Sequence, residues 1–164
     1  MATIYQKADE LVNGKKGSVF FTINGRRKEI PGIAKIEANV RLSTAPFVTV
    51  GTTKKQTRIT GREGVGSITF EYWMIKIFYG ELYGEYKRTG IFPEWDVMII
   101  NEHGGATLGS RTVQLFGCQL TGEIPVALLD STTDDGLRRD VSFTFEDDEG
   151  LEEFGDPQRV GREG

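Results

Sequence analysis

The sequence predicts a mainly β fold, a β-sandwich or barrel with one flanking α-helix. Three observations predict this class. Short alternations of apolar and polar residues recur along the chain, 21 glycines stand against 5 prolines, and one stretch repeats apolar residues at helical spacing. Period-two alternation is typical of strands with one buried face, and short strands joined by tight turns require many glycines.

Size and composition place limits on the function. The 164 residues, 38% hydrophobic and 27% charged, predict a single domain spanning 1–164. No apolar run approaches the roughly 20 residues that span a bilayer, and the first residues lack a secretory pattern. The single Cys118 fits a reducing compartment. A net charge of −4 argues against tight binding to a nucleic-acid backbone.

The first strands are predicted around a tight turn. Residues 1–16 are polar and are expected to form an N-terminal arm. The run GSVFFTINGRRKEI then predicts a β-hairpin, because Asn24-Gly25 between two apolar runs is a strong hairpin signal. Alternating apolar residues between 33 and 40 predict the next strand.

The segment from Ser43 to Arg62 loses this alternation and mixes Thr, Lys and Arg. We expect an extended polar loop at about 43–62. Such a loop within a compact domain is either functional or a mobile surface loop, and both alternatives stay open.

Three glycines precede or begin the next strand: Gly61, Gly64 and Gly66. A phosphate-binding loop would need a following Gly-Lys-Ser/Thr and a helix, and neither follows here. We therefore interpret them as turn glycines.

One helix is predicted from about Trp73 to Arg88, with Gly90 in the position of a C-terminal cap. Its apolar stripe is expected to belong to the core, not to a cofactor site. The stripe consists of Met74, Ile75, Phe78, Leu82 and Tyr86.

The second half of the chain predicts further strands at about 93–102 and Thr112–Leu120. In the latter, Val113 and Leu115 are expected on one face and Phe116 and Cys118 on the other. The closing strand contains Val141, Phe143 and Phe145 on its buried face. An acidic C-terminal arm is expected at about 147–164.

No catalytic, cofactor or metal site is predicted. His103 is the only histidine, and no nucleophile motif accompanies it. One Cys and one His do not supply a tetrahedral zinc site. The consecutive carboxylates are typical of a solvated surface instead of an acid/base pair held across a cleft. A hydrolase that uses His103 or an acid pair stays an alternative.

Charge distribution favours self-association. Cations lie in the predicted loop, whereas carboxylates crowd the C-terminal end, so copies of the chain attract head to tail. Scattered surface charge on a monomer is the alternative. Unguarded sheet edges also favour pairing between subunits. The candidate subunit-contact residues are Lys54, Lys55, Arg58, Arg62, Glu152 and Phe154.

Several motifs carry a family resemblance along almost the whole chain. These are GKKGSVFFTINGRRKEI, EANV, ITGREGVGSITFEYW, FPEWDVMIINE, LGSRTVQLFGCQLTGEIPVALLD and VSFTFEDDE, in this order. With them the chain resembles the tail-tube (core tail) proteins of contractile phages, PBSX-like defective prophages and phage-tail-like bacteriocins.

The resemblance implies a fold similar to the type VI secretion tube, with hexameric rings stacked into a hollow tube. It also implies a sheath outside the tube, a tape-measure protein in the lumen, baseplate and tail-terminator proteins, and a virion tail assembled in the host bacterial cytoplasm. DNA or ions would pass through the lumen without specific binding. A monomeric ligand- or carbohydrate-binding β-sandwich module is the alternative.

Overall fold

The computed structural model describes residues 3–4, 17–48, 50–51, 53–102, 109–155 and 160–161. Antiparallel strands dominate this part of the chain and one helical region accompanies them, so the mainly β class is confirmed. The chain divides into two compact units. Unit 1 contains Met1–Pro31, Trp95–Phe116 and Asp148–Gly164, and unit 2 contains Gly32–Glu94 and Gly117–Asp147.

Unit 1 contains the predicted hairpin. β2 (Gly17–Ile23) pairs with β3 (Arg26–Glu29) through a two-residue turn. Asn24 and Gly25 have φ values of 52° and 78°, which is the left-handed conformation that this type of turn requires. The other side of β2 pairs with β6 (Trp95–Glu102). The Asn-Gly signal in the sequence is therefore confirmed.

The remaining strands of unit 1 include both ends of the chain. β6 is followed in the sheet by β7 (Ser110–Thr121), which also pairs with β9 (Asp147–Glu152). The first residues of the predicted acidic arm thus form a strand and do not project freely. Within the predicted N-terminal arm, β1 (Thr3–Ile4) pairs with β10 (Val160–Gly161), and the rest of that arm lies outside the described residues.

Unit 2 is built on a long antiparallel hairpin. β4 (Ile33–Val48) pairs with β5 (Lys55–Glu71) along nearly its whole length. β5 pairs on its other side with β8 (Arg138–Phe145), and β8 pairs with the end of β7. The predicted loop at 43–62 was therefore wrong. Cross-strand pairing holds these polar residues in extended conformation, although their sequence lacks a buried face.

Each unit buries its own apolar residues. In β8, Val141, Phe143 and Phe145 are buried, which confirms the predicted alternation. The buried residues of unit 1 are Val19, Phe21, Ile23, Ile30, Trp95, Val97, Thr112 and Leu115. The buried hydrophobic residues of unit 2 are Ile68, Phe70, Met74, Ile77, Phe78, Leu82, Cys118, Val141, Phe143 and Phe145, and Gly32 and Pro125 are buried as well.

The predicted alternation along β7 was only partly correct. Leu115 and Cys118 are both buried although they are three residues apart. Thr112 is buried three residues before Leu115 in the same way. Gly117 has a φ of 64°, a left-handed conformation that interrupts the extended strand next to Cys118. The Glu146 side chain occupies the space where a Cβ of residue 117 would lie, 2.9 Å from its Cδ.

The glycines interpreted as turn residues lie inside β5, so that interpretation was wrong. A Cβ at Gly64 would lie 2.4 Å from the Phe145 ring, and one at Gly66 would lie 2.5 Å from the Phe143 ring. Both glycines therefore leave room for aromatic rings from β8 to cover the strand. A Cβ at Gly61 would meet nothing within 4 Å.

The predicted helix is present but changes geometry along its length. It begins with a 3-10 turn, η2 (Tyr72–Met74), continues as a π-helical stretch, η3 (Lys76–Tyr83), and ends as α1 (Gly84–Thr89). Met74, Phe78 and Leu82 of the predicted stripe are buried, and Ile77, which lies on the same face at three- to four-residue spacing, is buried as well. Tyr86, the last residue of the predicted stripe, is 45% exposed.

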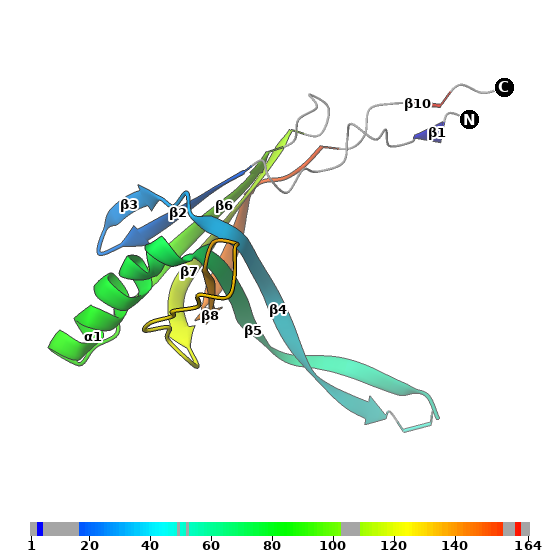
Figure 1. Cartoon of the computed structure of the whole chain (residues 1–164). Coiled ribbons are helices and arrows are strands. Elements are labelled where there is room, and N and C mark those ends of the chain that lie inside the picture. Colours follow the sequence, from blue (N-terminus) through cyan, green and yellow to red (C-terminus); the bar gives the residue numbers. More distant parts are fainter. Residues whose placement is uncertain are drawn as a thin grey trace. The chain divides into compact units, whose positions relative to one another are not determined.

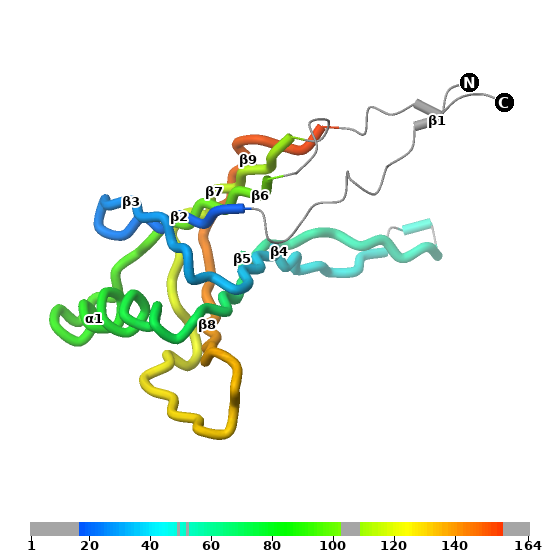
Figure 2. Tube along the Cα trace, turned by 45° about the horizontal axis from the view of Figure 1, so that its top comes forward, coloured from blue at the N-terminus to red at the C-terminus, as the bar shows by residue number. Residues whose placement is uncertain are grey.

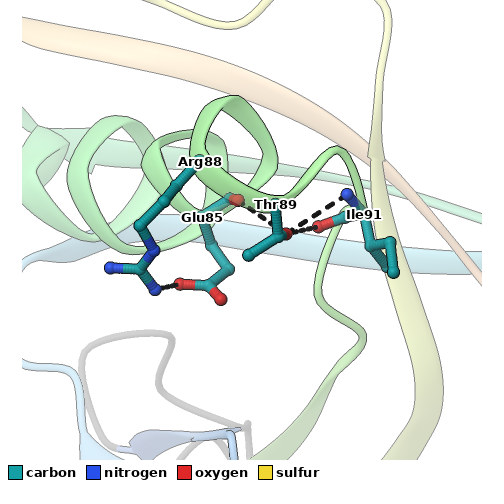
Figure 3. Close-up of polar contacts among 4 residues, drawn as sticks. All are labelled: Glu85, Arg88, Thr89 and Ile91. Carbon is teal, nitrogen blue, oxygen red and sulfur yellow. Dashed lines mark hydrogen bonds and ion pairs between the residues drawn. The ribbon is translucent and has the colours of Figure 1, made fainter.

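The end of the helix follows the predicted cap. Gly90 has a φ of 78° and donates its N–H to Tyr86 O at 2.8 Å. The Thr89 hydroxyl donates to Glu85 O at 2.9 Å and also contacts the backbone of Ile91 (Figure 3). Glu85 and Arg88 form an ion pair one turn apart. Within the described residues, no helix is long and apolar enough to cross a membrane.

Candidate assembly interface

The far part of the β4–β5 hairpin has no third strand beside it among the described strands. β8 pairs with β5 only from Gly64 to Glu71, whereas β4 and β5 stay paired out to Val48 and Lys55. We call this two-stranded part, residues 43–61 with its turn, the ribbon. Within unit 2 it extends away from α1 (Figure 1). Both strands of the ribbon thus have an edge that no strand of the described chain covers.

The ribbon has an irregular root. Ser43 is paired with Gly61 and Thr44 with Ile59, so Thr60 is an extra residue on β5. The Thr60 hydroxyl donates to Ser43 O at 3.1 Å across this bulge. A bulge bends a strand pair and increases its twist, so it sets the direction in which the ribbon leaves the sheet.

The predicted basic contact residues fall into two groups. Lys54, Lys55 and Arg58 lie on the ribbon, and all three are exposed. Arg62 lies just after the bulge in the chain, and its guanidinium is 3.7 Å from Asp147 Oδ1 in the same unit. Both side chains of this pair are more than half exposed, so the pair adds little to stability.

Apolar side chains accompany these cations on the ribbon. Val48 is 57% exposed and Val50 in the turn is fully exposed. Phe47 and Ile59 on the ribbon are also exposed, and so is Leu42 just before it. A gathering of exposed apolar side chains on one extension is typical of an interaction surface. Sequence reasoning missed these residues because the segment was interpreted as a loop; the apolar alternation at Val40 and Leu42 was the available signal.

The acidic candidates belong to unit 1. Glu152 is exposed at the end of β9, and Phe154 just beyond it is half-buried. Their neighbour Glu153 accepts two hydrogen bonds from Arg111 Nε, at 2.7 and 3.2 Å. The structure therefore pairs Arg62 with Asp147, and it assigns Glu152 and Phe154 to a different unit from the ribbon cations.

The sequence predicted no catalytic or metal site. His103 lies outside the described residues. In the part that is described, no three His, Cys, Asp or Glu side chains gather to hold a metal ion. The pKa of Glu37 is lowered by a hydrogen bond from Asn39 and by the nearby Lys35, but the Glu37 side chain is 52% exposed and lines no site.

Comparison with known proteins decides the family. A family profile described as "Phage tail tube protein" matches residues 4–152. The chain belongs to the phage tail tube protein family. It is 26% identical over 141 residues to the phage-like element PBSX protein XkdM of Bacillus subtilis (strain 168), covering 86% of this chain and 90% of that protein. The family resemblance inferred from the sequence motifs is confirmed.

Solved structures share the fold of this tail tube family member. A chain of the anti-feeding prophage tube-terminating cap superposes with a TM-score of 0.64 at 10% identity, covering 90% of this chain and 93% of that one. A chain of the sheath-tube complex of an extracellular contractile injection system gives 0.59 at 10% identity, covering 88% and 95%. These likenesses concern the fold. The family match confirms the predicted role as a structural tail-tube subunit, and the family is one of structural proteins.

Proposed function

We propose that copies of this subunit close into hexameric rings that stack into a hollow tail tube. The observation that carries the proposal is the ribbon, a two-stranded extension with uncovered edges and exposed Val48, Val50 and Ile59. Such a surface is a liability on a monomer, and neighbouring subunits would cover it. Membership of the tail tube family supports this assembly.

The candidate contact residues take their roles from this arrangement. The cations Lys54, Lys55 and Arg58 on the ribbon contact a neighbouring copy, and Arg62 joins them from beside the root, where it also lies near Asp147. Glu152 and Phe154, beyond the ribbon's own unit, offer an acidic and an apolar contact to neighbours. Heterologous contacts of this kind close into rings or extend into filaments.

Other tail components would bind the assembled tube. A sheath protein covers the outside, and baseplate and terminator proteins bind the ends; related chains come from a sheath-tube complex and a tube-terminating cap. A tape-measure protein fills the lumen until DNA, or ions in a bacteriocin, passes. Assembly takes place in the host bacterial cytoplasm. The net charge of −4 supports passage of DNA without retention, because phosphates and carboxylates repel. No catalytic step is required.

Electron microscopy of the purified full chain tests the proposal. Negative-stain images at increasing protein concentration are expected to show rings or rods with a central hole. Size-exclusion chromatography with light scattering gives the mass of the smallest closed species. A compact monomer at every concentration would contradict the tube and favour the monomeric binding module.

A further inference from the structure

Unit 2 exposes a second apolar surface, on the segment that connects β7 to β8. We call this segment, Gly122–Leu137, the β7–β8 loop. Leu129 is 95% exposed and Val126 is 59% exposed. The loop and the ribbon extend in different directions within unit 2 (Figures 1 and 2). A contact between these two surfaces would therefore join two copies of the chain.

Tyr72 holds the β7–β8 loop in place. Its hydroxyl accepts a hydrogen bond from Leu128 N at 3.0 Å, and its backbone N–H donates to Leu137 O at 3.0 Å. The carboxylate of Asp130 accepts from Thr132 N at 2.9 Å and from the Thr132 hydroxyl at 2.6 Å. These bonds lie on both sides of Leu129, so this exposed side chain is part of an ordered loop. A preorganised loop loses less conformational entropy when it binds a partner.

The charges of the two surfaces are complementary. The β7–β8 loop contains four carboxylates and no Lys or Arg: Glu123, Asp130, Asp134 and Asp135. Residues 43–61 contain Lys54, Lys55 and Arg58 and no Asp or Glu. Like charges disfavour contacts between two ribbons or between two loops, whereas a ribbon and a loop attract each other.

The acidic strand β9 is the competing surface. It exposes Leu151, but Asp147 at its start already pairs with Arg62, and Glu153 just beyond its end already pairs with Arg111. We propose that the ribbon tip of one copy docks on the β7–β8 loop of the next, with Val50 beside Leu129 and Lys54 and Lys55 facing Asp134 and Asp135. This contact rests on the proposed tube assembly and specifies one of its interfaces.

Disulfide trapping between copies tests the contact. Full-length Val50→Cys and Leu129→Cys proteins, one carrying a mass tag, are mixed, allowed to assemble and oxidised. Cys118 is fully buried, so it is left in place in both variants and is not expected to form a competing disulfide. The tagged–untagged dimer is expected to exceed either self-dimer by at least about tenfold, because an oriented pair has a high effective concentration. In the matched control, the Val50→Cys protein is mixed with a Leu151→Cys protein instead of the Leu129→Cys protein.

Charge exchange provides the second arm. The pair Asp134→Lys and Asp135→Lys is expected to raise the concentration needed for assembly by about tenfold or more. Adding Lys54→Glu and Lys55→Glu to the same chain restores assembly toward the wild-type value. Lack of restoration, with circular dichroism showing folded protein, would overturn the contact.

The outcomes separate the contact from the tube itself. If the wild type forms tubes but Val50→Cys is trapped with Leu151→Cys, or with neither partner, the ribbon–loop contact is overturned and the tube is not. A wild-type protein that stays monomeric at every concentration contradicts the tube and the contact together.

Discussion

Gly64 of β5 lies directly opposite Phe145 of β8, and the Phe145 ring occupies the space that any side chain at residue 64 would need. Gly66 and Phe143 repeat this relationship one pleat further along the same strands. The ladder of β5 with β8 therefore ends on two aromatic rings that lie over glycines. The ribbon begins where this support ends.

Gly64→Ala is expected to lower the free energy of unfolding by about 1–3 kcal/mol, the usual cost of overpacking. The added Cβ would lie 2.4 Å from the Phe145 ring. Chemical denaturation measures the effect. Gly61→Ala is the control, because its Cβ would meet nothing within 4 Å. In a Phe145→Leu background, Gly64→Ala should cost less; an undiminished cost would show that the ring is not the obstacle.

Gly80→Ala is expected to stabilise the subunit by about 1 kcal/mol, because alanine favours a helix over glycine and its Cβ would meet nothing within 4 Å. Gly90→Ala should have the opposite effect, since residue 90 has a φ of 78°. Thermal unfolding of both variants measures the two signs. A destabilised Gly80→Ala variant would contradict the described helix.

Tyr72→Phe is expected to loosen the β7–β8 loop at a cost of about 1 kcal/mol, because Leu128 N loses its acceptor. Hydrogen exchange of the Leu128 amide measures the change directly. Tyr86→Phe, on the exposed side of the helix, is the control. Equal protection of Leu128 in both variants would refute the role assigned to the Tyr72 hydroxyl.

Charge reversal of Lys54, Lys55 and Arg58 to Glu is expected to impair assembly while leaving the subunit folded, since all three side chains are exposed. Light scattering against protein concentration measures assembly, and circular dichroism measures folding. Added salt should weaken assembly of the wild type in the same direction. Arg26→Glu, on β3, is the control for a general effect of charge. Tubes of wild-type appearance from the triple variant would remove the ribbon cations from the interface.

The pKa of Asp130 is expected to depend on Thr132. Hydrogen bonds from the Thr132 hydroxyl and backbone N–H lower this pKa below the usual 3.8. A lowered folded-state pKa means that the contribution to stability is present above 3.8 and is lost as the pH falls through the lower folded-state value. Thr132→Val should raise the pKa toward 3.8 in a carboxyl NMR titration. Thr133→Val is the control, because Thr133 bonds Asp135 instead.

Local sequence signals predicted most of the regular elements. Asn24-Gly25 predicted the first hairpin, the alternation around Phe143 predicted β8, and Gly90 predicted the helix end. In each case the physical cause lies within a few residues: a left-handed turn, a two-residue repeat or a left-handed cap. The family resemblance likewise depended on motifs along the chain and needed no coordinates.

Only the tertiary structure showed that β4 and β5 stay paired through residues 43–61. Strand pairing is a contact between residues distant in the sequence, and the alternation that predicts strands on either side of this segment does not continue into it. Gly64 and Gly66 have the composition of a turn, and only the rings of β8 reveal that they make room for packing. Charge distribution and the expected uncovered sheet edges indicated self-association from the sequence, whereas pairing across strands determined which charged and apolar residues lie together on the ribbon.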